Sequence, residues 1–167
     1  MKAIKLLPQK NWFFIIALLP CFLFSKCKKD EVLPEYYIRC KIDGLNYLPN
    51  NCANCMRGQI LRDTVFLMNA NADYQTVGIG FYDGEKIGIK TYNLNGKTTG
   101  SAVYKNSTTT NDIFKTDSVR IGKLTVSVLD KTNKIIQGTF YFQAFNSLQN
   151  KTVTITEGKF RLKYTTN

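Results

Sequence analysis

The fold is decided by KLTVSVLD at residues 123–130, IIQGTFYFQAF at residues 135–145 and VTITEGKFRLKY at residues 153–164. Apolar residues alternate with polar ones along these stretches, as at Leu124, Val126 and Val128. Strict alternation of this kind is typical of strands that bury one face. A polar turn at Asp130–Lys134 joins the first two stretches. We therefore predict that the three strands form an antiparallel meander.

The third stretch changes parity part-way along its length. Val153 and Ile155 have odd numbers, whereas Phe160 and Leu162 have even numbers. A change of parity turns the apolar side chains to the other face of a sheet unless one extra residue is inserted. We therefore predict a β-bulge at Glu157-Gly158.

The chain before these stretches contains short β-rich runs separated by turn signals, and no helix-period segment from Tyr36 onward. The expected strands are Tyr36–Ile42, Leu45–Leu48, Thr64–Ala70, Val77–Tyr82, Ile87–Tyr92, Ser101–Tyr104 and Asp112–Lys115. Thr64–Ala70 is apolar on both faces, which predicts a central strand. Gly78 and Gly80 suggest close packing or a bulge. The pattern predicts one all-β domain over residues 36–167, an antiparallel β-sandwich or flattened barrel.

Two segments of this domain, GTFYFQAFN at residues 138–146 and VTITEGKF at residues 153–160, carry a resemblance to a known family. They resemble the carboxyl-terminal signature of Bacteroidota lipoproteins with domain of unknown function 6252. The early hairpin Lys41–Tyr47 is similar to one found in the same family. The resemblance implies an all-β domain of the cell envelope, and it supplies no activity and no functional residues.

The amino end has the layout of a bacterial lipoprotein signal. Three lysines precede an apolar run from Trp12 to Phe24, and Cys27 is followed by the charged stretch Lys28–Glu31. The apolar run is shorter than the ~20 residues that span a membrane as a helix. We expect residues 1–26 to be a signal peptide, Cys27 to carry the lipid, palmitate included, and residues 27–35 to be a tether. The predicted location is the outer membrane, on its periplasmic or its outer surface.

Other interpretations of this segment stay open. Lys26 departs from the small residue that usually precedes a lipidated cysteine. Cys21 is a rival acceptor, although Pro20 before it and the apolar residues after it make it the weaker choice. The apolar run is also compatible with an uncleaved membrane anchor, or with ordinary secretion in which Cys27 stays unmodified.

Charge and composition narrow the function. After residue 26 the chain holds 19 of the 23 Lys and Arg and all 12 Asp and Glu, so the mature charge is 19 − 12 = +7. This excess favours acidic lipid head groups or polyanionic sugars as partners, although scattered lysines more often protect strand edges. An exported chain without a basic cluster is not expected to bind nucleic acid. The chain has no histidine, which excludes Ser-His-Asp and Cys-His catalysis; we expect no cofactor, no metal and no enzymatic activity.

Three further cysteines, Cys40, Cys52 and Cys55, lie in the β-domain. In an oxidising envelope we expect a structural disulfide from Cys40 to the loop that holds the other two, with one thiol left over. Free thiols are the next alternative, and metal or redox roles come last, because zinc prefers four ligands and the Cys-Ala-Asn-Cys motif lies in a loop. The sequence does not determine the connectivity.

Several acidic and hydroxyl side chains are candidate sites. A carboxylate-based hydrolase would need two acids in one cleft, drawn from Asp63, Asp73, Asp83, Glu85, Asp112, Asp117, Asp130 and Glu157. We interpret these acids mainly as turn residues. Asp-Thr-Val and Asp-Ser-Val make Thr64 and Ser118 weak candidates for O-glycosylation.

Aromatic residues supply the remaining hypotheses. A sugar-stacking surface would use Tyr36, Tyr37, Tyr47, Tyr74, Tyr82 and Tyr92, although strand tyrosines more often pack across strands. A carrier of a small apolar ligand would need a barrel cavity lined by Phe66, Phe81, Phe140 and Phe142. The leading interpretation is a non-catalytic envelope lipoprotein that binds or scaffolds a glycan or protein partner.

Overall fold

The structure is a computed structural model, and it describes residues 34–50, 52, 54–97, 99–107 and 110–166. Its strands are β1 (Tyr37–Ile42), β2 (Leu45–Tyr47), β3 (Met56–Leu61), β4 (Val65–Ala72), β5 (Gln75–Tyr82), β6 (Thr91–Leu94), β7 (Ser101–Lys105), β8 (Ile113–Lys115), β9 (Gly122–Asp130), β10 (Ile135–Asn146) and β11 (Lys151–Thr166). A single 3-10 turn, η1 (Thr110–Asp112), precedes β8 within these ranges. The all-β prediction is confirmed.

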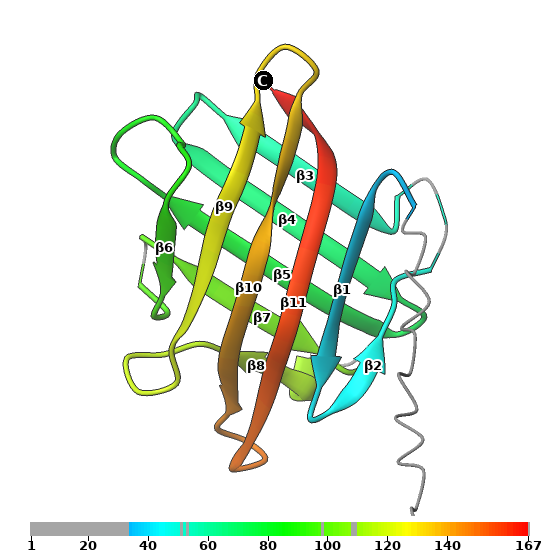
Figure 1. Ribbon diagram of the computed structural model, residues 1–167. Helices are drawn as coiled ribbons and strands as arrows, with labels where there is room; N and C mark the ends of the chain where they lie inside the picture. The colour runs from blue at the N-terminus through cyan, green and yellow to red at the C-terminus, as the bar shows by residue number, and fades with distance from the viewer. Residues whose placement is uncertain (1–33, 51, 53, 98, 108–109, 167) are drawn as a thin grey trace, which may run out of the picture. The chain divides into compact units, whose positions relative to one another are not determined.

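The strands form two layers that cross one another (Figure 1). The front layer has the order β6-β9-β10-β11-β1-β2, and the back layer has the order β3-β4-β5-β7-β8. Two corners join the layers: Phe145 of β10 pairs with Lys115 of β8, and the end of β11 runs parallel to β3. The β11–β3 pairing is the parallel one, and all other pairings between these strands are antiparallel. The domain is therefore a sandwich closed at both corners into a flattened barrel.

The predicted meander and the predicted bulge are both confirmed. β9, β10 and β11 pair in sequence as antiparallel neighbours. Along β11, Gly158 pairs with Phe140 but Ile155 pairs with Phe142, so one extra residue lies between them. The β1–β11 pair shifts at the same place, and Glu157 has a φ of 53°. The extra residue allows Ile155 and Phe160 to share the core.

β9 contains a second bulge, which the alternation in the sequence did not predict. Because of this bulge, the predicted set of inward-facing residues of β9 is partly wrong. Gln137 pairs with Val128 whereas Gly138 pairs with Val126, so Ser127 is the extra residue. Val128, which alternates with Leu124 and Val126 in the sequence, is consequently 37% exposed. Beyond the bulge Leu129 packs against the core instead.

Three other expectations differ from the structure. β3 had no counterpart in the sequence analysis, since Gly58 and Gln59 interrupt any apolar alternation there. The expected strand Ile87–Tyr92 is wrong: Ile87 is buried in a loop, and β6 begins at Thr91. β4 is central in its layer as predicted, but it buries only one face, because Leu67 points outward and is 37% exposed.

The core lies between the two layers and is rich in aromatic rings. Phe66 contacts Phe81 and Phe160 with ring centroids 5.3 and 6.1 Å apart. Phe140 lies 6.4 Å from both Phe142 and Phe160. The four phenylalanines proposed to line a ligand cavity thus pack as core side chains, buried to 3% exposure or less.

Candidate functional site

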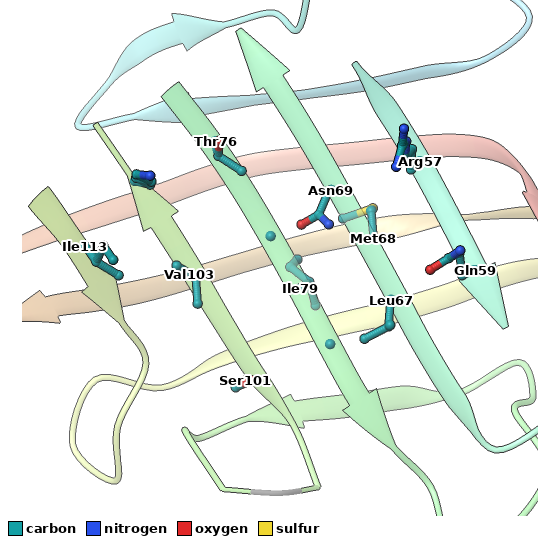
Figure 2. A pocket seen from close by; sticks show the side chains of 13 residues that line it. Arg57, Gln59, Leu67, Met68, Asn69, Thr76, Ile79, Ser101, Val103 and Ile113 are labelled. Atoms are coloured by element: carbon teal, nitrogen blue, oxygen red, sulfur yellow. The ribbon is translucent and has the colours of Figure 1, made fainter. Parts of the chain in front are cut away.

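A hollow of about 460 Å³ lies on the outer face of the back layer (Figure 2). Strand register explains its shape. Gly78 of β5 pairs with Asn69 of β4 and with Val103 of β7. Gly80, two residues on, faces outward from the same strand. The centre of the layer therefore has no side chains rising from β5, and we call this hollow the glycine trough.

The alternation in β5 produces this floor directly. Val77, Ile79 and Phe81 face the core, so the two glycines between them must face outward. The β4–β5 pairing continues without a register shift along both strands. Of the two interpretations offered by the sequence, close packing is confirmed and a bulge is wrong.

Side chains of β4 lean over the glycines. A Cβ atom at residue 78 would lie 2.8 Å from Asn69 Oδ1, and one at residue 80 would lie 3.1 Å from Leu67 Cδ2. Figure 2 shows both side chains extending over the trough from β4. These two side chains form the wall of the trough on the β4 side. Asn69 contributes an amide beside Gly78, and Leu67 contributes an apolar group beside Gly80.

A row of paired residues crosses the whole layer at the level of Gly78. Its members, in strand order, are Arg57, Asn69, Gly78, Val103 and Lys115. Neighbouring strands lie about 4.8 Å apart, so the two cations that end the row are roughly 19 Å from each other along the sheet. The row therefore has a positive charge at each end and an uncharged centre.

The outward face of the back layer is positive. Its described strand positions hold Arg57, Lys105 and Lys115 and no Asp or Glu. Of these cations, Arg57 and Lys105 line the trough. The other outward side chains that line it are amides, hydroxyls and a few apolar groups: Gln59, Asn69, Thr76, Ser101, Leu67, Val103 and Ile113. Such a set can donate and accept hydrogen bonds and pair with anions. Without any histidine in the chain it has no imidazole base to activate Ser101 or Thr76.

The model of the domain of unknown function DUF6252 matches residues 52–162, which is more than half of the chain. The chain belongs to this family. All five strands of the trough, from Met56 to Lys115, lie within the matched residues, as do both signature segments, whereas the hairpin Lys41–Tyr47 lies outside them. No curated protein and no solved structure matches the chain.

In this DUF6252 domain the cysteine pairing differs from the expected one. The disulfide joins Cys52 to Cys55, and Cys40 is a free, buried thiol. The Cys55 amide donates to the Cys52 carbonyl at 3.1 Å, and this turn brings the two Cα atoms within 5.2 Å. That separation suits a disulfide, so the motif closes on itself and the predicted bridge from Cys40 is wrong.

Cys40 is held in the core of the β-domain. Its side chain is only 5% exposed, and burial raises the pKa of the thiol to about 12. It pairs across strands with Tyr47, whose hydroxyl donates to the Ala70 carbonyl at 2.7 Å. Burial also raises the pKa of Tyr47. Both groups are therefore neutral structural residues at physiological pH.

The acids weighed for hydrolysis are distributed over separate turns of the domain. Asp117 and Asp130 accept hydrogen bonds from backbone amides of the following residues, which lowers the pKa of both carboxyls. Asp83 Oδ2 lies 2.7 Å from Lys90 Nζ, and Glu157 Oε1 lies 2.7 Å from Lys41 Nζ. In the part of the chain that the structure describes, no three His, Cys, Asp or Glu side chains are grouped as a metal site.

The tyrosines proposed as a sugar-stacking surface are divided between the core and the exterior. Tyr47 and Tyr92 are buried, and the Tyr92 ring stacks on Phe81 with centroids 3.8 Å apart. Tyr74 and Tyr82 are exposed, at 58% and 46%. The two buried rings therefore pack in the core, and none of these rings lines the glycine trough.

The remaining candidates of the sequence analysis have simple positions. Ser118 is exposed in the turn that follows β8, and Thr64 is half-buried in the β3–β4 turn. O-glycosylation at either residue stays a prediction. Cys27, Cys21 and the signal segment lie outside the described residues. Over the described ranges, the structure has no helix with the length and apolarity to span a bilayer.

Proposed function

We propose that this chain is a non-catalytic, lipid-anchored protein of the cell envelope that binds an acidic glycan in the glycine trough. The observation that carries this proposal is the row across the back layer, in which a glycine floor lies between Arg57 and Lys115. The absence of carboxylates from the described outward positions of these strands makes the face complementary to an anion.

The lining matches the chemistry of a sugar chain that bears acidic groups. Gln59, Asn69 and Ser101 offer amides and a hydroxyl for hydrogen bonds to sugar hydroxyls. Leu67 and Val103 offer apolar contact to the C–H faces of a ring. Arg57 and Lys105 supply charge-assisted hydrogen bonds to carboxylate or phosphate groups. A neutral glycan would be expected to stack on aromatic rings, and the trough has none.

An extended peptide is a poorer match. Peptides that bind sheets usually add a strand at an exposed edge, where backbone groups are unpaired. The trough lies over β5, whose backbone is paired with β4 on one side and β7 on the other. Recognition there must come from side chains. The carrier and hydrolase alternatives have no comparable support, since the four phenylalanines fill the core and the acids engage turn amides and lysines.

The anchor is proposed from the sequence alone. The apolar run before Cys27 and the charged residues after it support lipidation of this cysteine and retention at the outer membrane. Cys27→Ala in the producing cell should move the protein from the membrane fraction to the soluble fraction. Continued membrane association with unchanged mass would contradict the anchor.

The ligand is tested on the purified protein by calorimetry. The probes are a galacturonic acid oligomer, which bears carboxylates, and a glucose oligomer of equal length. We expect binding of the acidic oligomer only, and Arg57→Ala with Lys105→Ala should weaken it by at least about tenfold, the usual scale for charge-assisted hydrogen bonds. Lys123→Ala, on the front layer, is the control. Equal binding of both oligomers would contradict an acidic-glycan site in the trough. An equal loss of affinity in the Arg57/Lys105 variant and in the Lys123 control would contradict it as well.

A further inference from the structure

The outer face of the front layer holds a second positive feature, formed by Arg39, Lys159, Arg161 and Lys163, which we call the basic belt. We propose that the basic belt docks on the phosphate-bearing headgroups of the membrane in which the lipid anchor sits. The identity of that membrane rests on the proposed anchor, whereas the docking itself can be measured without any lipid on the protein.

Strand geometry gathers the four cations. Lys159, Arg161 and Lys163 occupy alternate positions of β11, so they share the outward face at spacings of roughly 6.6 Å. Lys159 is the direct cross-strand partner of Arg39 on β1. Like charges placed directly opposite one another on a sheet destabilise it. A polyanionic surface would complement the charge of these side chains.

Acids near the belt offset part of its charge. Glu157 lies at the bulge of β11 and forms its ion pair with Lys41 at 2.7 Å. Asp130 lies at the end of β9, interacts electrostatically with Arg161, and accepts hydrogen bonds from the amides of Thr132 and Asn133. Glu35 also lies near this face, because Glu35 and Arg161 both act electrostatically on Tyr36. Arg161 Nη1 donates to Gln137 Oε1 at 2.8 Å. Lys159 and Lys163 add two exposed cations to the same face.

Tyrosines accompany the cations on the same face. Tyr37 pairs across strands with Arg161, and its ring centroid lies 5.9 Å from the Arg39 guanidinium carbon. Tyr141, further along the layer, is 51% exposed. Tyrosine is enriched where a protein meets the headgroup region of a bilayer, because its ring is apolar and its hydroxyl is polar. Cations and tyrosines together favour a membrane surface over a small free anion.

The position of the belt along the chain suits this partner. Residues 28–36 separate Cys27 from the first residue of β1, and they span at most roughly 30 Å when fully extended. A lipid at Cys27 would hold β1, and with it the belt, close to the bilayer. The two layers face in opposite directions (Figure 1). Docking of the front layer would therefore leave the glycine trough directed away from the membrane.

The test uses the mature chain, from residue 27 onward, with Cys27→Ala. This chain retains the whole core, since the buried core residues lie between Ile38 and Tyr164. Binding is measured by co-sedimentation with vesicles of phosphatidylcholine alone or mixed with anionic phosphatidylglycerol. We expect binding to the anionic vesicles only, and a loss of binding as salt is raised, because surface charge is screened within a Debye length.

Two triple variants with the same change in net charge locate the contact. Lys159→Glu, Arg161→Glu and Lys163→Glu together should weaken anionic vesicle binding on the order of a hundredfold, at about fivefold for each charge removed. The matched variant changes Arg57, Lys105 and Lys115 to Glu on the opposite layer, and should stay within a few fold of the parent. Circular dichroism checks the fold. Should the first triple unfold, Lys159→Gln with Lys163→Gln alters only two exposed side chains.

The outcomes separate this inference from the proposed function. Equal losses in the two triple variants, or no preference for anionic vesicles, would overturn docking by the basic belt. Neither result would bear on the release of the Cys27→Ala protein in cells or on glycan binding. Conversely, selective loss in the front-layer variant would support the belt even if the acidic oligomer failed to bind the trough.

Discussion

Gly78 pairs with Asn69 across the β4–β5 ladder, and Asn69 Oδ1 stands 2.8 Å from the point where a Cβ on residue 78 would lie. This relationship makes the trough possible. The side chain of β4 uses the space that β5 leaves empty, and a hollow lined by amides remains between β4 and β7. The proposed ligand site thus depends on two residues that lie on different strands and meet only through register.

Filling the floor should abolish ligand binding without unfolding the domain. Gly80→Val adds a β-branched side chain whose Cβ would lie 3.1 Å from the flexible end of Leu67 and 3.9 Å from the Phe66 carbonyl oxygen. Valine favours strands, so the melting temperature should change little. Calorimetry with the acidic oligomer should show loss of binding. Unchanged affinity would mean that the ligand does not enter the trough.

Gly138 should tolerate no side chain, for a reason that is structural only. A Cβ there would lie 2.0 Å from the Thr125 carbonyl oxygen and 2.9 Å from the Phe160 ring. Gly138→Ala should lower the free energy of unfolding by about 3 kcal/mol or more, as for an overpacked core. Gly88→Ala, whose nearest atom would be 3.9 Å away, is the control and should stay within about 0.5 kcal/mol. Urea unfolding measures both.

Folding should require the extra residue at the β11 bulge, but it should not require that this residue is a glutamate. Deletion of Glu157 would direct either Ile155 or Phe160 out of the core, so we expect no cooperative unfolding transition. Glu157→Gly relieves the positive φ and loses only an exposed ion pair with Lys41. Its stability should therefore lie within about 1 kcal/mol of the parent. A stable deletion variant would show that the register is not held by this residue.

The cysteine arrangement can be checked by alkylation and mass spectrometry on the Cys27→Ala mature chain. The buried Cys40 should resist iodoacetamide in the native protein and react after unfolding. Two more thiols should appear only after reduction, when the Cys52–Cys55 disulfide opens. Three reactive thiols before reduction would contradict that disulfide.

Alkaline pH should destabilise the domain through Cys40. Its pKa is about 12 when folded and 9.0 as a model thiol, so the folded state retains its proton over a range in which the unfolded state loses it. Stability is therefore full below about pH 9 and falls as pH rises toward 12. Between pH 8 and pH 10 this one group should remove about 1.4 kcal/mol. Urea unfolding over this range should show a loss about 1.4 kcal/mol smaller in Cys40→Ala than in the parent. The loss that remains in Cys40→Ala comes from buried tyrosines with raised pKa, such as Tyr47.

Much of the fold follows from alternation that is visible in the chain itself. The sequence predicted the meander of β9, β10 and β11 and the bulge at Glu157. In a strand, side chains alternate between the two faces of the sheet, so the sequence alone indicates which residues share a face. Val128 was mispredicted, since Ser127 adds a residue to β9 and nothing in an even alternation marks it. β3 was missed because Gly58 and Gln59 lack the apolar pattern, and its position comes from pairing with β4 and β11.

The candidate sites, like the fold, were only partly predictable from the sequence. The glycines of β5 and the cations of β11 can be seen in the sequence, yet neither the trough nor the belt can. Each forms only when strands distant in the chain come into register, as when Arg39 meets Lys159 or Arg57 comes level with Gly78. The Cys52–Cys55 bridge was also missed, because one short turn set the distance between its Cα atoms.

By itself the sequence determined an all-β domain, the faces of its clearest strands and the place of one bulge, because these depend on residues close together in the chain. Only the tertiary structure decided the closure of two layers through β8–β10 and β3–β11, the hollow over Gly78 and Gly80, and the gathering of four cations on the opposite face. These features depend on which strands pair and in what register. Local alternation leaves that choice open, and burial of the shared core settles it.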